Sequence, residues 1–571
     1  MGTTDVAAYP WRFKLVLAML LCAVVVLSWR VIDLQILDHE FLSMEGDART
    51  LRTEEVKAYR GMILDRNGEP LAVSTPVVSL WANPQEVENP QAFAAALNGP
   101  LEISAEVLIQ RLRANSSREF IYLKRHLPPA QAAHILGLKV AGVYGRREYR
   151  RYYPAGEVAA HLVGFTNIDD AGQEGMELAY DGWLQGVSGS KLVMKDRYGR
   201  TVEDIKPLQV DKPGNNLYLS IDLRLQYLAY RELLAAVSEH KARSGSLVLL
   251  DAQTGEVLAM VNQPSYNPNK RSTINHSNLR NRAMTDVFEP GSTVKPLTVA
   301  AALDSGKYSP ESRINTAPGY LRIGRNTVRD HRNYGEIDLT TLLSKSSNVG
   351  AGKLALSLDP DAVWSIFSRV RLGQDTGSGF PGERVGLLPY HDNWQDIELV
   401  TLSYGYGVSV TALQLAQAYT PFADQGNLKR VSLLKQDQPV TGESVMSAGT
   451  ADKILSMLET VIKSGTGTRA RVPFYQVAGK TGTVHKNAAG NYQSDKYLAL
   501  FSGIAPVNSP RIVAVVVIDE PGGREYYGGE VAAPVFSRVI TGAMRLLDVA
   551  PDAQPEKAVV DSRVKSGGDA A

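Results

Sequence analysis

A continuous apolar run from Leu15 to Trp29 follows two basic residues near the start of the chain. Its 15 residues are fewer than the roughly 20 that cross a ~30 Å hydrocarbon core. Apolar residues continue past Arg30, however, and basic side chains at either end can snorkel toward the headgroups. No small-x-small cleavage site follows, which favours an uncleaved anchor at 13–37 over a signal peptide. Because basic residues precede the run and acidic residues follow it, we predict a cytoplasmic tail at 1–12, a single pass, and export of the rest.

From residue 38 to 215 the apolar pattern is short-ranged, charged and rich in turns. Asn67-Gly68 between apolar runs predicts a type I′ hairpin. Apolar spacing over 101–112 and 129–138 predicts two short amphipathic helices. No pairing of a nucleophile with a base is recognisable in this stretch. We therefore predict that 38–215 forms a non-catalytic structural or docking domain of mixed α/β type.

The pattern changes near residue 216, where strand-like runs occur at both ends of a long segment. We predict a strand at 217–221, a helix at 223–237, and strand hairpins that pair 245–251 with 255–261 and 496–505 with 511–520. The sequence between the two hairpins is largely helical or irregular. Strands at both ends with helices between them predict an α+β domain over 216–548, in which the ends share one antiparallel sheet.

Composition and charge narrow the function without naming it. The chain has 571 residues and a net charge of +1, so bulk charge gives no reason to expect a nucleic-acid partner. Cys22 is the single cysteine, which excludes an internal disulfide and a cysteine-based zinc site, and we find no metal-binding motif. Small and polar residues dominate 549–571, which predicts a disordered tail.

The first candidate for catalysis is Ser292-Thr293-Val294-Lys295. A serine needs a base to act as a nucleophile, and a lysine three residues later lies on the same face of a helix. The same spacing starts at four other serines: Ser188, Ser238, Ser432 and Ser562. Ser292 differs from them because Glu289-Pro290-Gly291 precedes it and an alanine-rich helix follows it. This context places it in the first turn of a helix, where backbone N–H groups are free.

Two further motifs follow along the chain. Ser346-Ser347-Asn348 comes after a predicted helix at 339–345 and offers a hydroxyl for proton relay and an amide for a substrate. Lys480-Thr481-Gly482-Thr483 lies in strand-like sequence that can pair with 496–505, and its glycine permits close approach to the backbone. The near copy Lys463-Ser464-Gly465-Thr466 ends a predicted helix at 451–462, and we interpret it as ordinary helix C-terminal sequence.

The three motifs, in this order, resemble the signature of penicillin-binding proteins and serine β-lactamases. Four further segments resemble the pedestal motifs of class B penicillin-binding proteins: Arg60-Gly61, Leu64-Asp65-Arg66-Asn67-Gly68, Tyr153-Pro154-Ala155-Gly156 and Gly172-Gln173-Glu174-Gly175-Met176-Glu177. Residues 287–296 and Tyr404-Gly405-Tyr406-Gly407 resemble the cell-division transpeptidases of that class. The resemblance covers nearly the whole chain. It implies an α+β penicillin-binding-protein/serine β-lactamase-like transpeptidase domain, preceded by an elongated pedestal and one transmembrane helix. The sequence before these motifs is too short for the glycosyltransferase domain of the class A proteins.

The resemblance implies a serine-type D-Ala-D-Ala transpeptidase that uses no cofactor. Ser292 is expected to attack the penultimate D-Ala carbonyl of a peptidoglycan stem peptide, and an amine of a neighbouring stem peptide to resolve the acyl-enzyme. Lys295 is expected to act as the base, because a charged Lys480 nearby disfavours a second positive charge.

The resemblance also implies roles for the remaining residues. Ser346 is expected to relay protons, and Asn348 to bind the peptide amide. Lys480 and the Thr481-Gly482-Thr483 segment are expected to bind the terminal carboxylate. Backbone N–H groups of Ser292 and Thr483 would form an oxyanion hole. Tyr406 and Tyr527 are expected to line the pocket, although both tyrosines are equally compatible with a packing role in the core.

By the same resemblance, β-lactam antibiotics are expected to acylate Ser292. The cell-division members of the family imply a periplasmic catalytic domain held in the bacterial inner membrane at the septum. They also imply a membrane-embedded lipid-II glycosyltransferase and other division proteins as partners. His485 stands where an arginine is expected in those members, which leaves a paralogous transpeptidase open. The motifs are also compatible with a D,D-carboxypeptidase or β-lactamase-like hydrolase, and with a β-lactam sensor or division scaffold.

Overall fold

The computed structural model describes residues 10–196, 201–438, 440–488 and 491–553. Most of the two predicted tails, at 1–12 and 549–571, therefore lies outside the described residues. The chain forms two compact units, each built from separate stretches of sequence. The first unit comprises Met1–Tyr59, Pro76–Tyr149 and Gly186–Gly214, and the second comprises Arg60–Thr75, Arg150–Gln185 and Asn215–Ala571.

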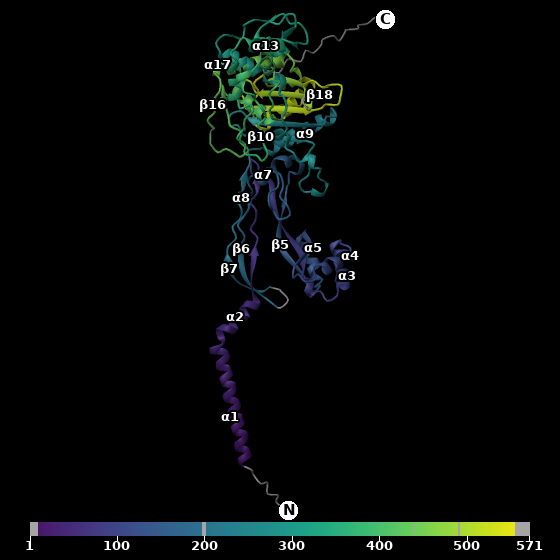
Figure 1. Cartoon of the computed structure of the whole chain (residues 1–571), viewed down its shortest axis with the longest axis vertical. Helices are drawn as coiled ribbons and strands as arrows, with labels where there is room; N and C mark the ends of the chain where they lie inside the picture. Colours follow the sequence, from purple (N-terminus) through teal and green to yellow (C-terminus); the bar gives the residue numbers. More distant parts are fainter. Residues whose placement is uncertain (1–9, 197–200, 439, 489–490, 554–571) are drawn as a thin grey trace, which may run out of the picture. The chain divides into compact units, whose positions relative to one another are not determined.

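The first unit begins with the predicted apolar helix. Helix α1 (Pro10–Ile32) continues into a π-helical turn η1 (Asp33–Leu37), as Figure 1 shows in purple. Within the described residues, Trp11–Leu37 is the one helical stretch long and apolar enough to cross a membrane. Its large apolar side chains are exposed rather than packed into a core. The prediction of one N-terminal apolar helix is confirmed.

The rest of the first unit consists of small sheets and short helices. Its further elements are α2 (His39–Thr50), β1 (Leu51–Val56), η2 (Pro84–Glu86), α3 (Pro90–Leu101), α4 (Ala105–Ala114), β4 (Ile121–Leu127), α5 (Pro129–Gly137), β6 (Gly189–Lys195) and β7 (Thr201–Gln209). Strands β3 (Pro70–Ala82) and β5 (Val143–Tyr152) contribute residues to both units. The helix predicted at 129–138 is present as α5. The helix predicted at 101–112 is wrong in its start, because the left-handed backbone of Glu102 (φ 55°) separates α3 from α4.

The predicted hairpin at Asn67-Gly68 forms in the second unit, but its turn is of a different type. Strand β2 (Ile63–Leu64) pairs antiparallel with β3, and Leu64 lies opposite Pro70. Gly68 has a positive φ of 90°, whereas Asn67 does not, so the turn is not type I′. The Asp65 carboxylate explains the longer loop, because its Oδ1 accepts hydrogen bonds from the backbone N–H groups of Asn67 (2.7 Å) and Glu69 (2.8 Å).

A five-stranded antiparallel sheet organises the second unit. Its order is β10 (Val257–Gln263), β9 (Ser244–Asp251), β19 (Ile512–Asp519), β18 (Asn491–Ala505) and β17 (Ala478–Ala488). Both predicted hairpins are present, and β9 pairs with β19, so the two ends of the predicted domain share one sheet. The strand predicted at 217–221 is shorter than expected: β8 is Leu217–Tyr218, and Asp222 already caps the next helix.

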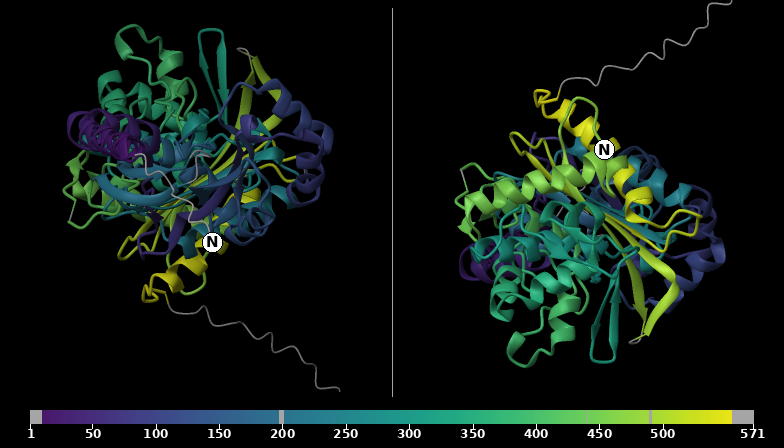
Figure 2. Two further views of the ribbon diagram at one scale, coloured as in Figure 1. Left: turned by 90° about the horizontal axis from the view of Figure 1, so that it is seen from below. Right: turned by 90° about the horizontal axis from the view of Figure 1, so that it is seen from above.

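Uninterrupted apolar runs in the central strands reflect burial on both faces of this sheet. Leu247 and Leu249 of β9 belong to one hydrophobic cluster with α9 (Leu223–Glu239) and α19 (Ala533–Leu546). Val248 and Leu250 point into the other cluster, which includes α16 (Ala412–Ala423) and α17 (Ala448–Ser464). Figure 2 shows helices of this unit on both sides of the strands. The α+β prediction is confirmed.

The remaining elements of the second unit are short or lie in the helical part between the hairpins. They are η3 (Gly156–Val158), α6 (Ala160–Val163), α7 (Gly175–Ala179), α8 (Asp181–Leu184), η4 (Arg271–Thr273), η5 (His276–Asn278), α10 (Arg282–Thr285), η6 (Gly291–Val294), α11 (Lys295–Asp304), β11 (Ile314–Asn315), β12 (Tyr320–Ile323), β13 (Asn326–Arg329), β14 (Glu336–Ile337), α12 (Leu339–Lys345), α13 (Asn348–Leu356), α14 (Pro360–Arg369), η7 (His391–Asn393), α15 (Asp396–Leu402), β15 (Asn427–Leu428), β16 (Glu443–Ser444), η8 (Thr468–Ala470) and α18 (Gly528–Val531).

Candidate active site

Ser292 lies in a short 3-10 turn, η6, that leads directly into the buried helix α11. Two hydrogen bonds hold this turn. Thr293 Oγ1 donates to the carbonyl of Pro290 at 2.7 Å, and the Tyr419 hydroxyl donates to the carbonyl of Thr293 at 2.6 Å. Ser292 itself is half-buried and lines a cavity of about 660 Å³. Its hydroxyl makes no hydrogen bond with any residue that the structure describes.

Two other segments pack closely against the turn that carries Ser292, because each has a glycine at the point of contact. A Cβ atom on Gly405 would lie 2.2 Å from the carbonyl oxygen of Gly291. A Cβ atom on Gly482 would lie 2.9 Å from the Thr293 side chain. Both distances are too short for a real contact, so a larger residue at either position would displace the turn that carries Ser292. The sequence predicts a close approach to the backbone at Gly482, and in the structure the turn that carries Ser292 makes this approach.

The two predicted lysines converge on one hydroxyl. Lys295 Nζ lies 3.1 Å from Ser346 Oγ and donates to Asn348 Oδ1 at 2.7 Å and to the Ser346 carbonyl at 2.6 Å. Lys480 Nζ reaches the same Ser346 Oγ at 3.0 Å from strand β17. Both lysine side chains are completely buried. The three sequence motifs therefore meet in one place, although they are spread over almost two hundred residues of sequence.

Burial of both ammonium groups changes their protonation. The pKa of Lys295 is lowered well below its ordinary value, first by burial and then by the neighbouring charge of Lys480, while Asp330 opposes the shift. Burial lowers the pKa of Lys480 to about 7. Lys295 is therefore suited to accept a proton at neutral pH. Lys480 is closer to half-charged than the fully charged group that the sequence predicts, and a bound carboxylate would raise its pKa again.

The turn between α12 and α13 places Ser346 and Asn348. Ser346 adopts the left-handed conformation (φ 58°) that ends α12, and Ser347 caps α13. Asp330 holds this turn: it accepts hydrogen bonds from Ser347 Oγ at 2.5 Å and from the backbone N–H of Asn348 at 2.6 Å. Sequence reasoning missed Asp330, because a single acid sixteen residues before the motif carries no local signal.

Strand β17 is the edge strand of the sheet and supplies the third side of the cavity. Thr481 and Thr483 line the cavity from this edge. Thr481 Oγ1 lies 2.7 Å from Thr466 Oγ1. Thr466 belongs to the near copy that we interpreted as helix-ending sequence. That interpretation holds for Lys463, which is exposed and pairs with Glu459 at 2.7 Å; it is wrong for Thr466, which lines the cavity.

An aromatic row forms another wall. His485, Tyr497, Tyr526 and Tyr527 follow one another with ring centroids 4.6, 4.4 and 4.4 Å apart. Tyr406 and Tyr527 both line the cavity, and Tyr527 is 42% exposed, so it is not a core packing residue. Among the described Ser-x-x-Lys serines, Ser292 alone lines this cavity. Ser432, for example, donates its hydroxyl to the carbonyl of Leu434 at 2.7 Å.

Comparison with known proteins agrees with this fold and this meeting of motifs. Residues 245–541 match the penicillin-binding protein transpeptidase domain, and residues 55–219 match the penicillin-binding protein dimerisation domain. A buried lysine pair beside a serine-bearing turn, within this α+β fold, defines a serine acyltransferase type of protein. The chain belongs to the class B penicillin-binding proteins.

Individual relatives are similar over nearly the full length. The chain is 46% identical to the peptidoglycan D,D-transpeptidase FtsI of Escherichia coli K12, covering 95% of this chain and 93% of that protein. It is 42% identical to the probable peptidoglycan D,D-transpeptidase PbpC of Pseudomonas aeruginosa, covering 98% and 99%. Among solved structures, the apo transpeptidase domain of Burkholderia pseudomallei penicillin-binding protein 3 has a TM-score of 0.55 and 41% identity, covering 59% of this chain and 98% of that chain.

Proposed function

We propose that this protein is a peptidoglycan D,D-transpeptidase that cross-links stem peptides through an acyl-enzyme on Ser292. The convergence of Lys295 and Lys480 on Ser346 Oγ, in the cavity that Ser292 lines, carries the proposal. The similarity to D,D-transpeptidases over more than nine-tenths of the chain supports the same activity.

In the acylation step, Ser292 Oγ attacks the carbonyl carbon of the penultimate D-Ala, and the peptide C–N bond breaks. Lys295 takes the serine proton, since burial lowers the pKa of this lysine. Ser346 contacts both lysines and passes a proton to the amine of the departing terminal D-Ala. The partly charged Lys480, together with Thr481 and Thr483, attracts the terminal carboxylate. Backbone N–H groups of Ser292 and Thr483 stabilise the developing oxyanion.

In the transfer step, an amine of a second stem peptide attacks the ester carbonyl. A new amide bond forms, the ester bond breaks, and a proton returns to Ser292 Oγ. β-Lactams enter the first step as donor analogues, and their opened ring stays attached to Ser292. Tyr406, Tyr527 and Gly482 shape the cavity in which the donor peptide lies.

Labelling with a fluorescent penicillin tests the assignment. We expect the wild type and Ser432→Ala to be labelled equally and Ser292→Ala to carry no label, because Ser432 has the same Ser-x-x-Lys spacing but lies outside the cavity. Label that survives Ser292→Ala, or disappears with Ser432→Ala, contradicts the proposal. Rapid release of opened penicillin would instead identify a hydrolase.

We further propose that α1 anchors the chain in the inner membrane with a cytoplasmic N-terminus and a periplasmic catalytic unit. In this arrangement residues 38–215 serve as a non-catalytic platform, and the enzyme acts at the septum with a membrane-embedded lipid-II glycosyltransferase and other division proteins. The exposed apolar surface of α1 and the similarity to FtsI support this. Complementation of cells depleted of their own FtsI tests the division role; failure of a well-expressed protein would favour a paralogous transpeptidase.

A further inference from the structure

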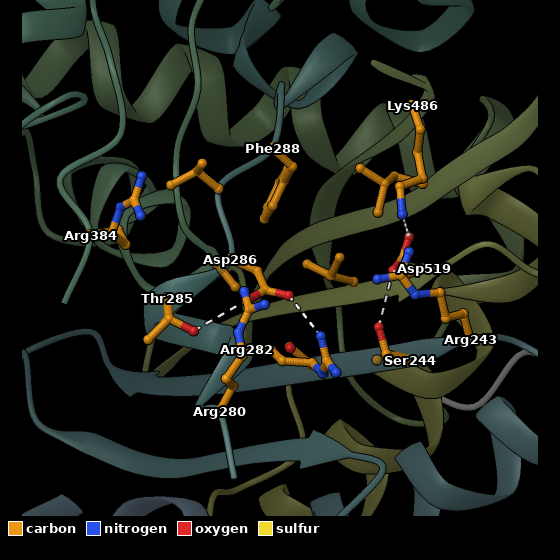
Figure 3. A pocket seen from close by; sticks show the side chains of 16 residues that line it. Arg243, Ser244, Arg280, Arg282, Thr285, Asp286, Phe288, Arg384, Lys486 and Asp519 are labelled. Atoms are coloured by element: carbon orange, nitrogen blue, oxygen red, sulfur yellow. Dashed lines mark hydrogen bonds and ion pairs between the residues drawn. The ribbon is translucent and has the colours of Figure 1, made fainter. Parts of the chain in front are cut away.

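A second cavity, of about 310 Å³, lies at one end of the sheet in the second unit (Figure 3). Its walls come from the beginning of β9, the end of β19, strand β17, helix α10 and the loop after α14. Five cationic side chains line it: Arg243, Arg280, Arg282, Arg384 and Lys486. We call this cavity the basic pocket.

Three carboxylates pair with four of these cations. Asp286 binds Arg280 and, at 3.0 Å, Arg282. Lys486 Nζ lies 2.7 Å from carboxylate oxygens of both Asp519 and Glu520, and Glu520 also accepts from Arg243 at 2.8 Å. Five cations against three carboxylates leave an excess of two positive charges. Since most of these side chains are partly exposed, this excess acts on a ligand that enters from solvent.

Arg384 is the cation that these acids do not neutralise. Its side chain is exposed and makes no hydrogen bond or ion pair with any residue that the structure describes, and Figure 3 shows it without a partner. Its backbone is nevertheless fixed, because the N–H of Arg384 donates to the carbonyl of Met284 in α10 at 3.0 Å. The backbone of Arg384 is thus fixed beside the pocket, and the donors of its guanidinium are available to a ligand.

A third cavity of about 340 Å³ lies between the basic pocket and the Ser292 cavity and has lining residues in common with each. The third cavity shares Val287, Phe288, Lys486 and Leu498 with the basic pocket. It shares His485 with the Ser292 cavity. The three cavities are therefore neighbours, and His485 and Phe288 lie between the Ser292 cavity and the arginines.

We propose that the basic pocket binds the C-terminal carboxylate of the acceptor stem peptide and so orients its amine toward the acyl-enzyme. This inference rests on the transpeptidase function proposed above. An arginine fork matches a carboxylate in two parallel hydrogen bonds. The donor carboxylate goes to Lys480, which leaves the basic pocket for the second peptide. The pocket then favours acceptors that carry a negative charge over neutral ones.

The test measures acceptor use by the full-length protein in detergent. The enzyme is acylated with a thioester donor, and transfer to a synthetic amine-bearing stem peptide is followed. This acceptor ends in a single D-Ala carboxylate, so it cannot itself act as a donor. We expect Arg384→Gln and Arg280→Gln each to raise the acceptor concentration for half-maximal transfer by about three- to tenfold. Arg384→Glu should raise it further, and higher salt should reduce the differences.

Matched controls separate this inference from the proposed function. For the same acceptor with an amidated C-terminus, the concentration for half-maximal transfer should be the same in the wild type and in the variants. Arg369→Gln, an exposed arginine of α14 that lines none of the three cavities, should behave as the wild type. Normal penicillin acylation with unchanged acceptor dependence in the Arg384 variants overturns the inference alone. A wild type that forms no acyl-enzyme overturns the proposed function and the inference with it.

Discussion

Two buried charge clusters in the second unit have opposite designs. In the first, Arg60 and Arg151 share the carboxylate of Glu177, at 2.7 and 2.6 Å, and all three side chains are at most 2% exposed. Asp181 adds a contact to Arg60 at 2.7 Å. Burial alone would lower the pKa of Arg60, but Glu177 and Asp181 outweigh it and raise this pKa. Every charge has a partner of the opposite sign.

The second cluster places two amines together, and no carboxylate of the described residues contacts either. Both lysines contact Ser346 Oγ, and their other partners in the described part of the chain are carbonyl and amide oxygens, all of them neutral. Asp330 acts on Lys295 from behind Ser347 and Asn348. A fold gains nothing from two like charges in its interior. Perturbed titratable groups of this kind are typical of catalytic sites. The arginine–glutamate cluster therefore stabilises the fold, whereas the lysine pair has the character of a reactive site.

Removing one lysine should cost activity without costing stability. We expect Lys295→Met to slow acylation by penicillin by about 10²- to 10⁴-fold, because the base for Ser292 is lost. The free energy of unfolding should not fall, since a buried amine that is costly to charge beside Lys480 is replaced by an apolar side chain of similar size. Stopped-flow acylation and urea unfolding measure the two effects. A stability loss as large as that from breaking the arginine cluster would contradict the comparison.

Breaking the arginine cluster should have the reverse effect. Glu177→Gln leaves two buried guanidinium groups short of a counter-charge, which should lower the free energy of unfolding by about 3–5 kcal/mol. Penicillin acylation of the folded fraction should stay within about twofold of the wild type. Glu443→Gln is the matched control: Glu443 is 66% exposed and lies 3.7 Å from Arg371, so its loss should cost less than about 1 kcal/mol.

The buried lysines should also show in the dependence of stability on pH. The pKa of Lys480 is about 7 in the folded protein against 10.5 as its ordinary value, so between these pH values the unfolded chain holds a proton that the folded chain has lost. Stability should therefore rise with pH in this window, by at most about 1.4 kcal/mol per unit from this residue. Below pH 7 both states are protonated and the slope vanishes. Urea unfolding of the wild type and of Lys480→Met at pH 7 and 9 measures how the free energy of unfolding changes with pH. An identical change in both proteins would contradict the conclusion that burial lowers the pKa of Lys480. Lys463→Met is the exposed control.

Much of this site could be predicted from short local patterns. Pro290-Gly291 before Ser292 predicts the helix start, and the strand-like sequence around Lys480 predicts its pairing with β18. Both are found, because each depends on residues within one element. The double-sided burial of β9 and β19 likewise follows from their unbroken apolar runs.

The contacts that complete the site could not be predicted in this way. Asp330 holds the Ser347-Asn348 turn from a different loop, and Thr466 reaches Thr481 from the end of α17. Neither residue has a neighbour in sequence that marks its role. The positions of Asp330 and Thr466 depend on how separate elements pack against one another. The spacing of residues along the sequence gives no information about that packing. The near copy at Lys463 was misleading for the same reason: its lysine faces solvent, while its threonine faces the cavity.

The smallest expected effect concerns that threonine. Thr466→Val removes the hydroxyl 2.7 Å from Thr481 Oγ1 but keeps the shape of the side chain. We expect penicillin acylation to slow by about three- to tenfold, because Thr481 loses the partner that orients it toward the substrate carboxylate. With a penicillin analogue whose carboxylate is esterified, Thr466→Val should slow acylation less, because the hydrogen bond between Thr466 and Thr481 affects the rate through the carboxylate. Thr460→Val, at a partly exposed position of α17 where the hydroxyl donates to the carbonyl of Ser456, is the control and should leave the rate unchanged. An equal loss with both analogues would show that Thr466 supports the strand rather than the carboxylate site.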